Sequence, residues 1–501
     1  MRFPIFNKLP KKIFCATLLP MASLCIKAQS FIEVLEMSRQ QSTEAQIAEM
    51  KFQYKELAYR YYNTDKKPLI SFSTTPIQYN KDIIQRYSYD EDCTYYRTQN
   101  SLHSSANIRL TQNAYRLGGF FYIDSDTHLY KSLGKYVYKQ FTATPLRLGY
   151  SQTLVGYNPF KWQKRTEELS YTIAEKELLH CLEDITTDAV EKFIIVELLC
   201  ELRKLAESNL YNCDTLCLAA EKKIQYGRLS RKDYAELLLE RSKAYNTYQK
   251  YSLELIEAES SLKRVLNLSE ADTLDVTMLD IIQNIEHVID IPMSDAIQFA
   301  LENSTDILVA EKNILEARQD VERLKVKRYL DATINVSIGL HQISETLQKV
   351  YRHPLDEQTA SVSMSIPLAD FGRGRILYSQ ARTALAIQSI QTKRIKDDVR
   401  ELIKKCVLRH SMLYSIINDA QQAYHLSCVA YNETLAEYHL GRWSVNSLSE
   451  AVANRQEALV EYYQAIRDYL LNYFQIRNMT LFDFEKNECI KKYQDKASTI
   501  Q

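Results

Sequence analysis

The chain has 501 residues with 63 basic and 63 acidic side chains, so its formal net charge at pH 7 is zero. This balance excludes the basic footprint of a nucleic-acid binder, and no nucleic-acid partner is expected. The length by itself is a soft prior for two or three ordinary domains.

Residues 1–28 have the pattern of a secretory signal peptide. A basic region ending at Lys12 precedes an apolar stretch at 13–26, and Ala28 stands before the expected cleavage site. Cleavage would remove five basic and no acidic side chains, leaving 58 basic against 63 acidic groups and a net charge of about −5. A lipid-modified Cys25 is the alternative, and the bulky Leu24 before it speaks against that modification.

Two isolated glycines predict two long helical hairpins. Gly227 is the only glycine or proline within 160–291, and Gly441 is the only one after residue 375. Because glycine ends a helix at little cost, each predicts the tip of a hairpin. An offset of 214 residues superimposes the two tips, which indicates an internal duplication.

Heptad spacing extends the duplication along the helices. Residues from Val399 to Tyr438 recur at alternating steps of four and three, and the same offset places a matching seam at 185–224 and aligns Arg241 with Arg455. An ordinary coiled coil is one explanation. Small and polar members interleaved along the seam favour helices packed side by side in a tube wall. His410 lies on the seam and is expected to be packed rather than to bind a ligand.

A second offset, of 262 residues, aligns the first helices of the two copies. It superimposes Ser42 on Ser304, so a helix at 31–63 is matched by one that starts near Pro292 and runs to about residue 330. The two offsets differ by 48 residues, which indicates an insertion of about that length in the first copy.

These patterns predict the organisation of the chain. The expected parts are a signal peptide (1–28), a first repeat (29–268; strands at about 69–75 and 145–154, an inserted segment at about 78–144, tip at 227), an equatorial linker (269–292), a second repeat (293–484; strands at about 332–340 and 359–367, tip at 441) and a C-terminal tail (485–501).

The strands of the second copy have the pattern of membrane-spanning strands. Apolar residues from Ile334 to Leu340 alternate with small polar ones over about nine positions, as expected with lipid on one face and water on the other. The edge of a soluble sandwich is the alternative. Segments 105–111 and 120–125 predict an additional hairpin within the insertion. No segment after the signal has the roughly 18 consecutive apolar residues of a transmembrane helix, so a membrane location would require a β-barrel.

Nothing in the sequence supports an enzyme. Its nine histidines are dispersed, it has no glycine-rich phosphate loop, and no nucleophile stands in a strained turn. Cys213 and Cys217 lie four apart, but a metal site would need a second matched pair of ligands, so buried thiols are expected. No catalytic residue, metal or cofactor is therefore expected.

Segment 365–375, Ser-Ile-Pro-Leu-Ala-Asp-Phe-Gly-Arg-Gly-Arg, resembles the strand-to-helix junction of the TolC-type outer-membrane efflux family. In that junction a Pro-Leu pair precedes an aromatic-Gly-Arg turn. The order of helices, strands and tips from 31 to 484 resembles the same family. The junction residues are Pro367, Leu368, Asp370, Phe371 and Gly372.

The resemblance implies a mainly α fold with membrane β-strands. A long α-helical barrel of coiled-coil hairpins would be continuous with a trimeric transmembrane β-barrel, with two internal structural repeats per chain. Each chain of the homotrimer would give four strands to a shared barrel of twelve. Residues 269–292 and the C-terminal segment would form a belt around the helical tube.

The resemblance also implies a passive export duct in the outer membrane of a Gram-negative cell, with its helical tube in the periplasm. The duct would dock to a periplasmic membrane-fusion adaptor and an inner-membrane efflux pump or ABC exporter, in tripartite efflux or type I secretion. Outer-membrane lipid would surround the barrel. The alternative is a periplasmic or surface coiled-coil structural or adaptor protein without transport activity. The sequence leaves the cargo open, because a wide duct recognises little.

Residues near the two tips receive roles from the same resemblance. The periplasmic entrance, or gate, would use Asp233, Glu236, Tyr438 and Glu450. Ser447 and Trp443 stand where the family has a carboxylate and an arginine, so the latch would be only partly retained. Acids at a helix start also stabilise the helix dipole without any gate, which leaves both interpretations open. The adaptor-docking tips would be Gly227, Arg228, Leu229, Gly441, Arg442 and Trp443.

Overall fold

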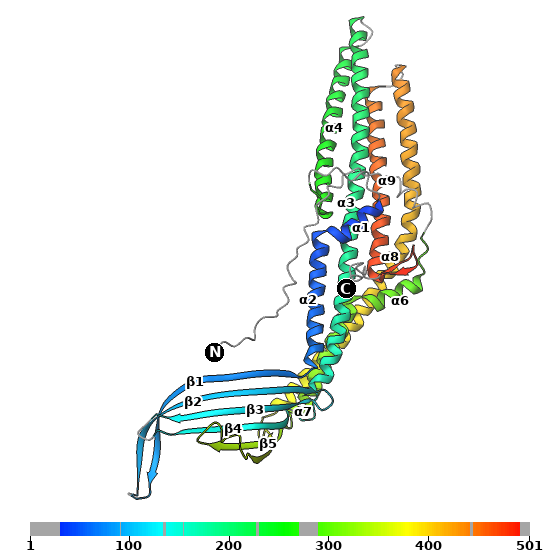
Figure 1. Ribbon diagram of the computed structural model, residues 1–501. Coiled ribbons are helices and arrows are strands. Elements are labelled where there is room, and N and C mark those ends of the chain that lie inside the picture. The colour runs from blue at the N-terminus through cyan, green and yellow to red at the C-terminus, as the bar shows by residue number, and fades with distance from the viewer. Residues whose placement is uncertain are drawn as a thin grey trace. The chain divides into compact units, whose positions relative to one another are not determined.

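The computed structural model describes residues 31–90, 92–133, 137–153, 155–226, 230–269, 289–440 and 444–490 (Figure 1). The expected signal peptide, both tips and most of the expected linker and tail lie outside the described residues. The chain divides into two compact units. Unit 1 comprises Met1–Thr43, Ile185–Val288 and Ile416–Asp468, and unit 2 comprises Glu44–Asp184, Ile289–Ser415 and Tyr469–Gln501.

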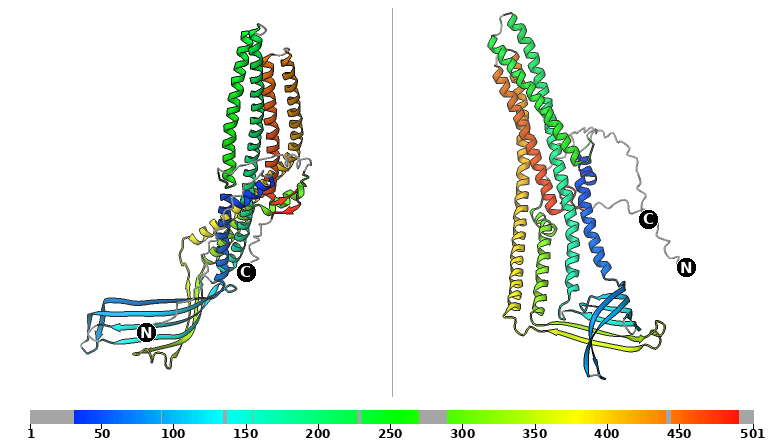
Figure 2. Two further views of the ribbon diagram at one scale, coloured as in Figure 1. Left: turned by 45° about the horizontal axis from the view of Figure 1, so that its top comes forward. Right: turned by 90° about the vertical axis from the view of Figure 1, so that its left-hand side faces the viewer.

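Unit 1 is built from two helical hairpins. Helices α3 (Pro159–Gln225) and α4 (Arg231–Val265) form one hairpin, and α8 (Arg373–His439) and α9 (Val445–Thr480) form the other. The hairpins lie side by side, with α3 and α9 in the middle (Figures 1 and 2). All four helices contribute to one core, which contains Leu216, Cys217, Ala220, Leu237, Tyr431, Val445, Leu448 and Val452.

The heptad seam predicted from spacing is buried within the hairpins. On α8 its buried members include Ile403, Cys406, Leu413 and Ile417. On α3 the buried matching positions include Ile185, Ala206 and Ala220. Seam residues at alternating steps of four and three face a neighbouring helix, so a long helix without glycine or proline is stabilised along its whole length.

Helices of unit 2 lie in a row that ends in α2 on one flank and α8 on the other (Figure 2). Helix α2 (Thr43–Asp65) packs on α3 through Phe52 against Leu178. The indole of Trp162 on α3 donates to Glu322 on α7 (Thr305–Lys327) at 3.1 Å. Lys396 on α8 pairs with Glu311 on α7 at 2.7 Å.

Each of the two N-terminal helices expected to be continuous is broken at a serine. Ser42 separates α1 (Phe31–Gln41) from α2, and Ser304 separates α6 (Met293–Asn303) from α7. Ser304 Oγ accepts the Ile307 N–H at 3.4 Å and so caps α7. An N-cap serine lets the chain end one helix and start the next without a glycine. The two serines are the pair that the 262-residue offset aligned.

Unit 2 carries one antiparallel sheet whose six strands follow chain order. The strands are β1 (Leu69–Ser88), β2 (Cys93–Ala114), β3 (Gly119–Ser132), β4 (Lys139–Gln152), β5 (Asp331–Ser344) and β6 (Leu355–Ser365). A small second sheet pairs β7 (Phe482–Asp483) with β8 (Glu488–Cys489).

The sheet corrects the expectation of four strands per chain. The inserted segment forms β2 and β3, and this hairpin lies between β1 and β4 as part of the sheet. The first strand also continues to Ser88, well beyond residue 75, because β2 pairs with it along its length. Strand β6 ends at Ser365 rather than 367, since Pro367 has no N–H for the ladder.

In the part of the chain that the structure describes, no helix combines the length and apolar character needed to cross a membrane.

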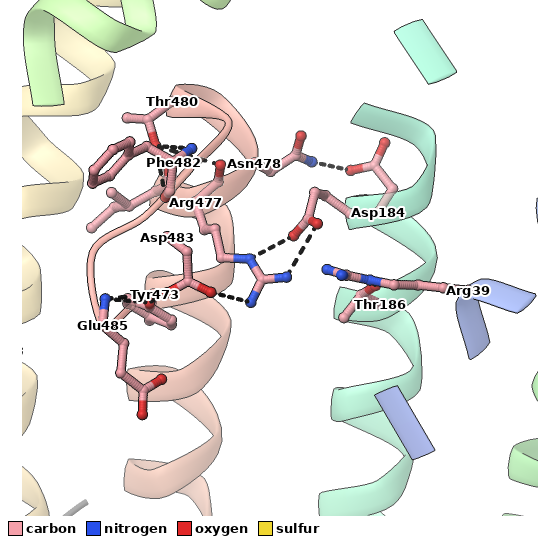
Figure 3. Close-up of polar contacts among 12 residues, drawn as sticks. Arg39, Asp184, Thr186, Tyr473, Arg477, Asn478, Thr480, Phe482, Asp483 and Glu485 are labelled. Carbon is pink, nitrogen blue, oxygen red and sulfur yellow. Dashed lines mark hydrogen bonds and ion pairs between the residues drawn. The ribbon is translucent and has the colours of Figure 1, made fainter. Parts of the chain in front are cut away.

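A buried polar network ties the end of α9 to α3 (Figure 3). The Arg477 guanidinium donates to Glu183 from Nε at 2.8 Å and from Nη2 at 3.1 Å, and it lies 3.4 Å from Asp483 Oδ2. Tyr473 donates its hydroxyl to Asp483 at 2.8 Å. Burial lowers the pKa of Arg477, but the charges of Glu183 and Asp483 raise it more, so the guanidinium stays charged.

We expect Glu183→Ala to destabilise the folded chain by about 3 to 5 kcal/mol, because it leaves a buried guanidinium with only its longer contact to Asp483. Thermal melting followed by circular dichroism measures the loss. Glu56→Ala is the control: it removes an exposed pair with Arg60 and should cost at most about 1 kcal/mol. Equal effects of the two changes would contradict the role of the buried pair.

Candidate functional site

One face of the six-stranded sheet is apolar on strands β1 to β5, and β6 continues the row with Gln358. A single row of register partners runs from β1 to β5 through Ile70, Leu110, Ile123, Leu148 and Ile338. Most of this row is exposed in the single chain, Ile70 at 69% and Ile338 at 57%. An apolar face of this extent needs an apolar environment or a partner to cover it.

The opposite face is polar and charged. The adjacent row runs from β1 to β6 through Ser71, Arg109, Asp124, Arg147, Gly339 and Glu357. Arg109 pairs with Asp124 at 2.7 Å, and Arg147 lies 3.8 Å from Asp124, 3.4 Å from Asp126 and 3.6 Å from Glu357. We call Arg109, Asp124, Asp126, Arg147 and Glu357 the charged row.

Gly339 allows the charged row to cross strand β5. A Cβ at this position would stand 2.8 Å from the Leu146 carbonyl oxygen and 3.0 Å from Arg147 Cα, closer than real contacts allow. Without a side chain on β5, Arg147 on β4 reaches Glu357 on β6. Two arginines and three carboxylates leave the charged row with a net charge of about −1 per chain.

In the sequence, Arg109 and Arg147 each stand between two apolar residues of a strand, but the sequence does not show which residues they contact. Asp124 has a fully buried side chain between the two arginines. Their association depends on strand register, which pairs residues far apart in the chain.

The predicted gate residues lie at or near helix starts. Asp233 stands in the first turn of α4, where its N–H donates to the N-cap Ser230 Oγ at 3.1 Å. Glu236 forms a 3.6 Å pair with Lys232 one turn away. Glu450 is exposed near the start of α9. Carboxylates at these positions can stabilise the start of a helix through its dipole. They are also accessible to solvent, as residues of a gate would be.

Tyr438 is half-buried against the core shared by the two hairpins. Burial raises the pKa of its hydroxyl, and the neighbouring Cys217, Cys213 and Asp233 raise that pKa further. Asp233 and Tyr438 are therefore close enough to interact electrostatically. The docking residues Gly227, Arg228, Leu229, Gly441, Arg442 and Trp443 lie outside the described residues.

The two arginines aligned by the repeat contact different partners. Arg241 on α4 pairs with Asp214 on α3. The guanidinium of Arg455 on α9 is buried over the Tyr431 ring of α8, 3.7 Å from its centroid. Asn212 donates to the Tyr431 hydroxyl at 2.8 Å. The sequence pointed to this pair only as a repeat match, and the structure shows that both residues join neighbouring helices.

The strand-to-helix junction exposes two apolar side chains. Leu368 is 98% exposed and Phe371 is 97% exposed. Asp370 accepts the Gly372 N–H at 2.9 Å and the Gly374 N–H at 2.8 Å, which holds the start of α8 and lowers the pKa of its carboxyl. Gly372 adopts φ 85°, a conformation that favours glycine, and Phe371 adopts φ 51° despite its side chain.

His410 is packed and has no hydrogen-bond partner at either ring nitrogen within the described residues. Its ring stacks on Tyr469 with 4.5 Å between centroids. Burial lowers its pKa from 6.5 to about 4, so the ring is neutral at pH 7. Among the described residues, no three His, Cys, Asp or Glu side chains gather as a metal site would require.

Solved structures of outer-membrane channels share this arrangement. The Campylobacter jejuni CmeC outer-membrane channel matches with a TM-score of 0.63 at 11% identity, over 91% of this chain and 88% of that one. The CusC channel matches with a TM-score of 0.62 at 13% identity, over 90% and 91%. The Vibrio cholerae outer-membrane protein VceC matches with a TM-score of 0.60 at 12% identity, over 90% and 95%.

The chain has the fold of the TolC-type outer-membrane efflux proteins. No protein-family model matches the sequence. No curated protein matches it either. The TolC-type fold is thus recognised through the order and pairing of elements, at 11 to 13% identity.

We expect His410 to make this chain less stable as the pH falls. Its folded pKa of about 4 lies below the ordinary 6.5, so the unfolded state binds the proton first and stability is lost from pH 6.5 down to 4, by about 3 kcal/mol. His410→Phe keeps the stacked ring without the titration, so its melting temperature should fall less between pH 7 and 4. His425→Ala, at an exposed position, should behave like the unchanged protein. An undiminished fall in His410→Phe would show that other groups set the acid response.

Proposed function

We propose that this chain is the channel of an export system in the outer membrane of a Gram-negative cell. Three copies would form a passive duct whose helical tube stands in the periplasm. The observation that carries the proposal is the two-faced sheet, apolar and exposed on one side and charged on the other, within a TolC-type fold. Such a sheet suits lipid outside and water inside.

The sheet of one chain has two open edges, at β1 and β6. Unpaired backbone groups are too costly in lipid for such edges to remain open there. Because six strands alternate in direction, β6 of one copy would run antiparallel to β1 of the next. Identical copies would therefore close the sheet head to tail.

Exposed apolar stripes on the flanking helices support the same assembly. Ile47, Met50, Tyr54, Leu57 and Tyr61 recur on α2 at steps of three and four, and they are 47 to 74% exposed. The α8 flank of unit 2 has its own exposed residues, among them Ile376, Ile387 and Ile390. A stripe at this spacing is typical of a helix that packs on another helix. A neighbouring copy would cover both flanks.

The two hairpins would provide the docking end of the duct. A periplasmic membrane-fusion adaptor would engage the tips around Gly227 and Gly441, and an inner-membrane efflux pump or ABC exporter would supply the energy. In this role the chain binds no cofactor and is not an enzyme. A coiled-coil structural or adaptor protein without transport is the second candidate, but it gives no role to a sheet with an exposed apolar face.

The proposal is tested by location, oligomeric state and the facing of strand β5. We expect a heat-modifiable trimer in the outer-membrane fraction. Val336→Arg, on the apolar face, should cost about 2 to 4 kcal/mol near mid-bilayer and reduce the trimer, whereas Ser337→Arg on the polar face should be tolerated. Greater damage from Ser337→Arg, or a periplasmic monomer, would contradict the proposal.

A gate at the tips predicts a change in ion selectivity. In a trimer, Asp233 and Glu450 would place six carboxylates around the mouth, which favours cations. Changing both to alanine should lower the cation-to-anion permeability ratio in planar bilayers. Tyr438→Phe removes no charge and should leave that ratio unchanged. An unaltered ratio in the double variant would mean that these acids only stabilise the helix starts.

A further inference from the structure

The inserted hairpin β2–β3 gives the proposed channel a wider membrane wall. We infer that this hairpin is part of the barrel itself, so that each copy contributes six strands and three copies close a barrel of eighteen. The inference rests on the trimeric channel proposed above. The partner at each open edge is a second copy of this chain.

Strand pairing shows that the hairpin is built into the sheet. Strand β2 pairs with β1 from Leu69↔Thr111 onward, and β3 pairs with β4 from Phe120↔Ser151 onward. A plug or an external flap would leave β1 and β4 as neighbours, but here two full strands separate them. Removing the hairpin from the wall would break both ladders.

The two faces of the hairpin continue the faces of the sheet on either side. Ile108 lies opposite Phe72 of β1, and Ile123 lies opposite Leu148 of β4, all on the apolar face. Where a strand pair has no bulge, the apolar residues of one strand lie on the same face as the apolar residues of its neighbour. A segment outside the membrane would have no reason to expose apolar residues on the same face as β5.

The charged row links the hairpin electrostatically to its neighbours. Asp124 and Asp126 of β3 are buried carboxylates, and Arg147 of β4 lies 3.8 Å and 3.4 Å from them. Without the hairpin, Arg147 would lose both aspartates and keep Glu357 at 3.6 Å and the Thr144 hydroxyl at 3.0 Å. Buried charges are stable only with such partners. The hairpin and the strands that flank it therefore form one unit.

The parts of the two edge strands next to the helices have the composition of strands meant to pair, whereas charged residues and a proline lie farther along β1 and charged residues lie at the start of β6. Segments 69–75 of β1 and 359–365 of β6 contain no charged residue and no proline. Native edges that stay unpaired are usually protected by such residues. Each edge also continues into a flanking helix whose exposed apolar stripe needs cover, α2 beside β1 and α8 beside β6. A second copy of this chain offers the complementary edge and flank together.

The added strands affect the bore. Barrel diameter grows roughly in proportion to strand number, so eighteen strands make a barrel about one and a half times as wide as twelve. The net charge of the charged row, about −1 per chain, would recur three times around that lumen.

The test uses full-length protein and two matched pairs of neighbouring residues. Ile108→Arg should lower the yield of outer-membrane trimer more than about tenfold, as we also expect of Val336→Arg, while Asn107→Arg, opposite Asp126, should not. A second measurement uses variants that keep their fold. In vesicles, brominated lipid should quench the tryptophan fluorescence of Phe121→Trp but not that of Tyr122→Trp, because the two positions lie on opposite faces of the sheet.

A tolerated Ile108→Arg together with unquenched Phe121→Trp would overturn the inference, provided that Val336→Arg still prevents assembly. If Val336→Arg were also tolerated, the proposed channel itself would fail. Electron cryo-microscopy of the trimer in nanodiscs gives the direct count, where eighteen strands are expected and twelve would contradict the inference.

Discussion

Backbone hydrogen bonding at the edges of one antiparallel sheet is the constraint on which the rest of this structure depends. Within the six-stranded sheet, each of the four inner strands has a neighbour on both sides, and β1 and β6 form the two edges. In lipid the backbone groups along those edges need a partner, because no water is available to satisfy them. The uncharged segments 69–75 and 359–365 and the exposed apolar stripes of the flanking helices agree with that need. The proposal that the chain works only as part of a ring of copies follows from the same need.

The register of the strands determines which side chains meet on each face of the sheet. Neighbouring residues on a strand point to opposite faces of the sheet. Ile338 therefore belongs to the apolar row, and the next residue, Gly339, belongs to the charged row on the other face. The absence of a side chain at Gly339 lets Arg147 span a strand, while the bulk of Ile338 maintains the apolar face. A slip of one residue would exchange the two faces, so register is specified by the same alternation that separates the apolar row from the charged row.

The helical part follows a different rule. Helices of 67 residues, such as α3 and α8, are stable only because a continuous seam is buried against neighbours. Polar side chains that are buried between these helices contact specific partners. Arg477 is held by Glu183 and Asp483, Arg455 by the Tyr431 ring, and His410 stays neutral beneath Tyr469. The contact of Arg477 with Glu183 joins α9 to α3, and the two ring contacts join α8 to α9.

The sequence alone determined the features that arise from local periodicity. Runs without glycine or proline predicted α3, α4, α8 and α9, and alternation along 334–340 predicted strand β5. Ser42 and Ser304 were visible as a repeat match, but the helix breaks at these serines were missed. At Ser304 the side chain accepts a backbone N–H and caps the next helix.

Tertiary structure decided what depends on pairing between distant segments. The position of the inserted hairpin inside the sheet, the six strands per chain and the charged row all rest on register, such as that of Arg147 with Gly339. The same is true of Asp124, whose burial between two arginines no local pattern reveals. Local sequence sets which face of a strand is apolar, but long-range backbone hydrogen bonds choose its neighbour, and the neighbours create the site.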